Sequence, residues 1–131
     1  MRATAEATWG VLKAVDRLLE AIANGRHRDS VDAFTGDEDA MLVGPEPGEV
    51  AIGPEALSAF FADLYARPDR LIFDLSERRV SAMGSVAWLT GEGTYRLSTG
   101  GADKPFRLVA VLERRRGVWL WQLFSASEPC P

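Results

Sequence analysis

The chain has 131 residues, of which 47% are hydrophobic, and this is enough for one domain over residues 1–131 with a core and a cavity inside it. Its 15 basic and 19 acidic residues give a net charge of -4, which argues against a nucleic-acid partner. No apolar run approaches the ~20 residues of a membrane-spanning helix, and the first residues lack the pattern of a signal peptide. We therefore expect a cytoplasmic protein with no membrane partner. The single cysteine, Cys130, excludes a disulfide within the chain.

Helical patterns occupy the first half of the sequence. Ala5 to Asn24 carries apolar residues three to four positions apart, which predicts an amphipathic helix that ends at Gly25. A shorter helix is expected from Asp29 to Phe34. A third helix is predicted to begin at Pro54, where proline suits the first helical position, and to stop before Pro68.

Strand patterns fill the rest of the chain. A small hairpin is expected at residues 40–52, around a turn of two prolines and a glycine. Four longer runs rich in Val, Leu, Phe, Tyr and Trp follow without a helix between them. They are Arg70 to Ala82, Ser85 to Ser98, Lys104 to Arg114 and Val118 to Ser127. The order of the elements indicates an α+β fold.

Several of these strands are apolar on both faces. In Val118 to Phe124, strict alternation places Trp119, Trp121 and Leu123 on one side and other apolar residues on the opposite side. A sheet with one face in water does not need two tryptophans there. We therefore expect a homodimer through a sheet face that carries Trp88, Trp119 and Trp121. The alternative is that loops or the first helix cover this face.

The run from Ser85 to Ser98 indicates a cavity. Gly91 and Gly93 share a face with Leu89 and Tyr95, and two glycines on one face leave room above a sheet and let it bend. The alternative is that both glycines serve only as bend points.

Three motifs stand out in the chain: Gly53-Pro54-Glu55-Ala56-Leu57, Gly84-Ser85-Val86-Ala87-Trp88-Leu89-Thr90, and Gly117-Val118-Trp119 leading to Ser127-Glu128-Pro129. Together they resemble the nuclear transport factor 2-like superfamily in its SnoaL-like branch. This resemblance implies a cone-shaped, strongly curved mixed or antiparallel sheet that wraps around N-terminal helices and holds an internal pocket. It also implies dimers packed through their sheets.

The resemblance does not select one function. Some similar proteins are isomerases, cyclases or dehydratases, and others are binding or assembly modules. Similar closing strands often read Trp-x-x-x-His-x-His-x-Ser, as in the association domain of calcium/calmodulin-dependent kinases. This chain has Leu123 and Ser125 at the two histidine positions.

We expect a mostly apolar pocket between the helices and the sheet. Its predicted lining is Trp9, Phe34, Leu57, Phe61, Leu89, Gly91, Gly93, Tyr95, Leu108, Ala110 and Gln122. The preferred function is the binding of a small hydrophobic molecule in this pocket, without a cofactor. A dimerisation or interaction module without a ligand is an alternative.

A cofactor-independent isomerase, cyclase or dehydratase is the other alternative. It would use Asp74 or Glu92 as the base and Tyr95 as the donor to a developing oxyanion. For Glu92, an ion pair with an arginine such as Arg107 is the simpler interpretation. The only histidine, His27, is expected in a solvated loop, and we expect no metal site.

Overall fold

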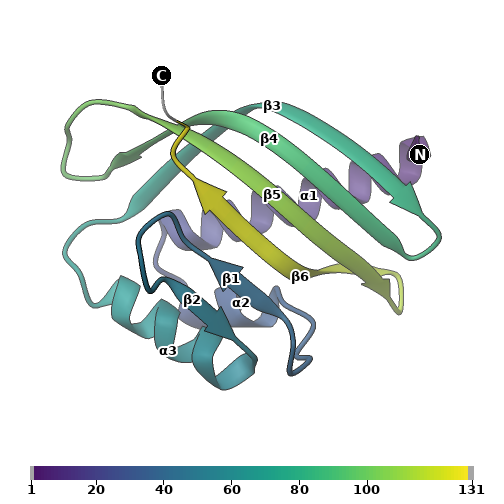
Figure 1. The fold of residues 1–131 in the computed structure, drawn as a ribbon, viewed down its shortest axis with the longest axis horizontal. Helices are drawn as coiled ribbons and strands as arrows, with labels where there is room; N and C mark the ends of the chain where they lie inside the picture. The colour runs from purple at the N-terminus through teal and green to yellow at the C-terminus, as the bar shows by residue number, and fades with distance from the viewer. Residues whose placement is uncertain (1, 130–131) are drawn as a thin grey trace.

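Three helices and one six-stranded sheet make up the computed structural model, which describes residues 2–129 (Figure 1). The elements are α1 (Ala5–Ala23), α2 (His27–Asp32), β1 (Met41–Val43), β2 (Val50–Ile52), α3 (Pro54–Tyr65), β3 (Leu71–Met83), β4 (Val86–Leu97), β5 (Lys104–Arg115) and β6 (Val118–Ser127). The strand order is β2-β1-β6-β5-β4-β3. All neighbours are antiparallel except β1 and β6, which are parallel.

The sheet curves around the helices, as Figure 1 shows, with α1 behind the long strands and α2 and α3 beside the short ones. This confirms the predicted α+β cone with a mixed sheet. The four long strands begin and end within about one residue of the predicted bounds. The second helix differs, because it begins at His27 instead of Asp29.

α1 forms where its sequence supplies both a cap and an apolar stripe. The Oγ1 of Thr4 accepts a hydrogen bond from the backbone N–H of Ala7 at 3.0 Å, which satisfies one of the free donors of the first turn. Gly25 follows the helix with φ of +64°, a conformation that suits glycine. The buried stripe that faces the sheet contains Val11, Val15, Leu18, Leu19 and Ile22.

The sheet has an inner face toward the helices and an outer face away from them. Alternate residues of β4 and β5 are buried on the inner face, where they form the core with the helices. These inner-face residues are Ala87, Leu89, Phe106, Leu108, Ala110 and Leu112.

A β-bulge in β6 changes the face of its tryptophans. Val111 pairs with Leu123 and Leu112 pairs with Trp121, so that Gln122 is an extra residue without a partner. Trp121 is therefore fully buried on the inner face, and Trp119 is 8% exposed. The prediction that these two residues share an open face with Trp88 is wrong, because strict alternation does not hold across the bulge.

A second bulge lies opposite the two glycines of β4. The register between β3 and β4 shifts between Asp74 and Glu77, and the backbone of β3 approaches Gly93 closely. A Cβ atom at Gly93 would lie 1.8 Å from the carbonyl oxygen of Asp74, and one at Gly91 would lie 2.8 Å from the Leu75 side chain. The glycines therefore make room for the bulge, as the bend-point alternative states.

We expect Gly93→Ala to destabilise the protein by about 1 to 3 kcal/mol, because the backbone of β3 must move away from the added methyl group. The free energy of unfolding, measured in denaturant, tests this. Thr90→Ala, at an exposed position of the same strand, is the matched control. Equal stability of the two variants would contradict the steric interpretation.

Candidate functional site

A cavity of about 310 Å³ opens between α3, the β1–β2 hairpin, the β4–β5 loop and the adjoining end of the long strands. This volume lies at the lower end of the range for ligand pockets, ~300–1,000 Å³. α3 contributes Phe60, Phe61 and Leu64 to its wall. The long strands contribute Leu71, Phe73, Phe106, Phe124 and Ala126. The body of the cavity is therefore apolar.

Three aromatic rings pack together on the sheet side of the cavity. The ring centroids of Phe73 and Phe106 are 4.6 Å apart, and the ring of Tyr95 is 6.2 Å from each of them. These separations are within the range of favourable aromatic pairs. The register of β3, β4 and β5 explains the cluster, because Phe73 and Tyr95 are paired neighbours and Phe106 lies on the next strand.

The polar end of the cavity centres on the hydroxyl group of Tyr95, which donates a hydrogen bond to the carboxylate of Glu128. Burial raises the pKa of Tyr95 to about 12, and the hydrogen bond to Glu128 and the negative charges of Glu128, Glu46 and Glu49 add to the increase. Tyr95 therefore stays protonated at neutral pH, and its one proton points toward Glu128.

Charged residues of both signs line the cavity. Glu46 and Glu49 come from the β1–β2 hairpin, where the backbone N–H of Glu46 donates to Oε1 of Glu49 at 2.8 Å. Basic side chains also line it, namely Arg67, Arg96 and Lys104. Within residues 2–129, none of these five residues takes part in an ion pair, and neither does Glu128.

Two of the predicted lining residues, Phe61 and Tyr95, are on the wall of this cavity. Five others are buried in the adjoining core, namely Phe34, Leu57, Leu89, Leu108 and Ala110. Gly91 and Gly93 lie at the β3 bulge. Trp9 is 65% exposed on α1, and Gln122 donates a hydrogen bond to Asp37.

The two candidate bases lie outside the cavity wall. Asp74 is exposed at the β3 bulge, and Glu92 accepts a hydrogen bond from Arg107 at 2.7 Å on the outer face. The simpler interpretation of Glu92 as an ion-pair partner therefore fits the structure. His27 is not a loop residue, because it begins α2 and its Nε2 lies 2.9 Å from the carbonyl oxygen of Ser58 in α3.

The sequence interpretation missed Glu128. The sequence pattern that could have identified Glu128 is the alternation Phe124, Ala126, Glu128. This alternation continues the inner face of the sheet just past the end of β6. The sequence assigns Glu46 only to the hairpin turn and Glu49 only to the start of its second strand, and predicts no site role for either.

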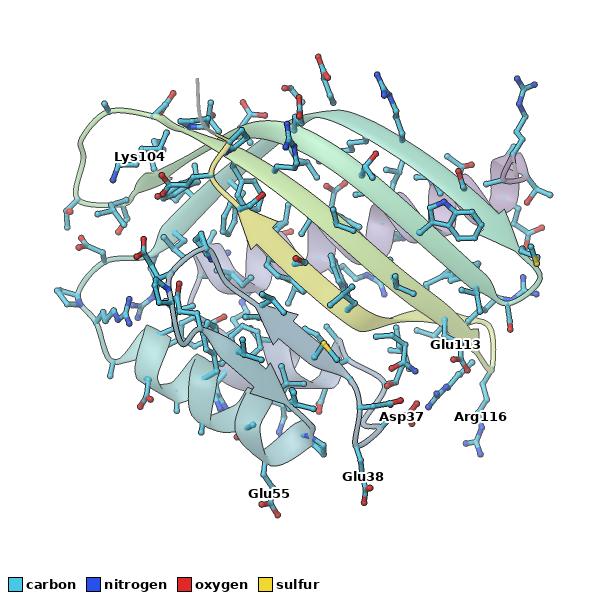
Figure 2. The ribbon with its side chains drawn as sticks, viewed as in Figure 1. Asp37, Glu38, Glu55, Lys104, Glu113 and Arg116 are labelled. Carbon is cyan, nitrogen blue, oxygen red and sulfur yellow. The ribbon has the colours of Figure 1, made fainter. Side chains whose placement is uncertain are left out.

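A separate polar cluster joins the loop before β1 to the β5–β6 hairpin (Figure 2). Arg115 donates to both carboxylate oxygens of Asp37, at 2.9 and 2.5 Å, and its Nε donates to Glu113 at 2.9 Å. The Nε2 of Gln122 also donates to Asp37, at 2.8 Å. Asp37 thus anchors the loop before β1 to the sheet.

No group of three or more His, Cys, Asp or Glu side chains in the described residues could hold a metal ion. Across residues 2–129, none of the helices combines the length and the apolar character needed to cross a membrane.

The Asp37 cluster predicts acid-dependent stability. Its hydrogen bonds, first those from Arg115, lower the pKa of Asp37 from 3.8 to about 2 in the folded protein. The unfolded chain therefore takes up this proton first as the pH falls, and the stabilisation is complete above about pH 4 and is lost toward pH 2. Asp37→Asn should flatten the stability profile in this window, and Asp63→Asn on α3 should not. Parallel profiles for Asp37→Asn and the wild type in thermal melts would contradict the assignment.

A family model described as a SnoaL-like domain matches residues 11–129. No match was found among curated proteins. An NTF2-like protein of unknown function from Pseudomonas putida superposes with a TM-score of 0.84 at 15% identity, covering 98% of this chain and 90% of that one. A protein with a cystatin-like fold from Nostoc punctiforme gives 0.80 at 16%, covering 98% and 96%. A ketosteroid isomerase-like protein from Erwinia carotovora gives 0.67 at 19%, covering 98% and 100%.

Proposed function

The chain belongs to the SnoaL-like domain family of the NTF2-like superfamily, and we propose that it binds a small hydrophobic molecule in the cavity between α3 and the sheet. The observation that carries this proposal is a 310 Å³ cavity with a largely apolar wall. An apolar surface that stays in contact with water contributes nothing to folding, and an apolar ligand gains ~0.8 kcal/mol for each CH₂ group that it buries there.

The shape of the core supports the same proposal. Large residues such as Trp121, Leu18 and Leu108 fill the space between α1, α2 and the middle of the sheet. The chain therefore has side chains large enough to close its interior, yet the end of the sheet at Ala126 stays open. A space that small residues and loops keep open is typical of a binding site.

An isomerase, cyclase or dehydratase is the second candidate, because the Glu128 carboxylate lies on the cavity wall and can accept a proton from a bound molecule. Glu128 replaces Asp74 and Glu92 in this role. The role of Tyr95 as a donor is less favourable, because its single proton is donated to Glu128. This alternative would be supported if a bound molecule were converted to a product and if Glu128→Gln slowed the conversion.

We also propose that the chain forms a homodimer through the outer face of the sheet. One row of this face crosses five strands and is apolar throughout: Trp88, Val111, Leu123, Met41 and Ile52. Ile52, at the end of this row, is 52% exposed. Val109 and Val86, which lie beside the row, are 39% and 38% exposed. A contiguous apolar face of this kind favours contact with a second copy.

Filling the cavity tests the binding proposal. We expect Ala126→Phe to weaken binding of an apolar fluorescent probe by about tenfold or more, because the new ring occupies the site. Ser127→Phe adds the same ring to the outer face and should leave the affinity unchanged. Fluorescence titration measures both. If Ala126→Phe remains folded and binds the probe like the wild type, the cavity is not the binding site.

Changing the apolar row tests the dimer. Leu123→Glu places a charge in the middle of the proposed interface, and we expect it to give a monomer. Ser127→Glu, on the same strand and face beside Arg107, is the control that should remain dimeric. Sedimentation analysis measures the mass of each variant. A monomeric wild-type protein would contradict the proposal.

A further inference from the structure

The polar end of the cavity contains hydrogen-bond acceptors, and the one hydroxyl donor there is already used. Tyr95 donates its proton to Glu128, so a ligand meets only the lone pairs of the phenol oxygen. The side chains of Glu46 and Glu49, which also line the cavity, accept hydrogen bonds when ionised. A ligand group at this end therefore has to supply the protons.

The same end of the cavity carries a negative potential. Glu46, Glu49 and Glu128 all line the cavity with Tyr95, and Glu128 accepts the hydrogen bond of its hydroxyl group. In keeping with this placement, the negative charges of the three carboxylates raise the pKa of Tyr95. Since the described residues provide none of these carboxylates with an ion-pair partner, a cationic group on the ligand would be the first to neutralise them. An anionic group would be repelled.

The aromatic cluster adds a second attraction for a cation. The rings of Phe73, Tyr95 and Phe106 lie together on the sheet side of the cavity, next to the phenol oxygen. The negative faces of aromatic rings attract a positive charge, and ammonium ligands are often bound in this way. Apolar residues of α3, such as Phe60 and Leu64, continue the wall away from this end.

The basic side chains on the wall do not reverse this polarity. Lys104 pairs with Tyr95 across β4 and β5, and Figure 2 shows it at the start of β5 beside the β4–β5 loop. Lys104, Arg67 and Arg96 are all exposed, as Glu46 and Glu128 are, so exposure alone does not separate the two signs of charge. What separates them is direct contact, because the Tyr95 hydroxyl group is hydrogen-bonded to the Glu128 carboxylate.

From these observations we propose that the cavity selects apolar molecules that carry a protonated amine, with the ammonium group beside the hydrogen-bonded pair of Tyr95 and Glu128 and the apolar body against α3. This proposal rests on the proposed function, because it assigns a ligand class to the same cavity. The ammonium donates hydrogen bonds to the Glu128 carboxylate and to the phenol oxygen, and Tyr95 keeps its own proton.

Three probes of equal chain length, octylamine, octan-1-ol and octanoate, separate the effect of the charge on the ligand from the effect of its apolar chain. Isothermal titration calorimetry with the whole chain should give the tightest binding for octylamine, by about tenfold over octan-1-ol, as expected for one charge-assisted hydrogen bond at a partly solvated site. Octanoate should bind most weakly. Added salt should reduce the preference for octylamine, because it screens exposed charges.

Variants of the carboxylates test where the amine of the ligand binds. Glu128→Gln should reduce the preference for octylamine over octan-1-ol while the affinity for octan-1-ol stays the same. Glu46→Gln, which changes an exposed carboxylate on the wall, provides a second test if Glu128→Gln fails to fold. Glu55→Gln is the matched control, because this exposed carboxylate at the start of α3 is not on the cavity wall (Figure 2).

The outcomes distinguish the two proposals. If octan-1-ol or octanoate binds as tightly as octylamine, the amine preference is overturned and the apolar binding site remains. An octylamine preference that persists in both Glu128→Gln and Glu46→Gln also overturns the assignment of the amine to this end. If none of the three probes binds, the proposed function itself is overturned.

Discussion

The backbone of β3 comes so close to Gly93 that there is no space for a side chain between the carbonyl oxygen of Asp74 and β4. This contact occurs at the bulge where the register of the two strands shifts. A bulge bends its strand and increases the local twist, and here it lies part of the way along the two long strands at the edge of the sheet. The inner face beyond the bend, at Phe73 and Tyr95, borders the cavity and packs against the edge of the core. The close approach at Gly93 thus separates the closed part of the interior from the open part.

The bulge at Gln122, in the inner strand β6, determines which side chains pack between the sheet and α3. It turns both Trp121 and Phe124 to the inner face, where their ring centroids are 5.3 Å apart. Phe34 packs on Trp121 at 6.3 Å and on Phe61 at 6.2 Å, which continues the aromatic packing into α3. Since α3 carries Phe60 and Leu64 on the cavity wall, this packing fixes the position of that wall relative to the sheet. The same bulge leaves Gln122 free to hydrogen-bond Asp37.

Periodicity and turn residues were sufficient to predict the helices, the hairpin and the four long strands, because these signals are local. The faces of β6 could not be predicted in this way, since one extra residue at Gln122 reverses the alternation and nothing in the sequence marks it. The same limit applied to the site. Phe61 and Tyr95 were found from their apolar faces. The alternation Phe124, Ala126, Glu128 places Glu128 on the inner face, but its position beside Tyr95 and the β1–β2 hairpin depends on β6 lying between β5 and β1. Contacts of this kind depend on the strand order, which no local pattern of residues specifies.

The pairing of Tyr95 with Glu128 links the architecture to the choice between binding and catalysis. An oxyanion that forms on a substrate needs donors whose protons are free and a potential that is not negative. Here the phenol proton is donated to a carboxylate, and Glu46 and Glu49 add negative charge nearby. A developing negative charge at this end would therefore be destabilised, whereas a neutral or positive ligand group would not. Because the strands that position Tyr95 and Glu128 also form the apolar wall, the same arrangement favours a ligand with an apolar body and a group that donates hydrogen bonds.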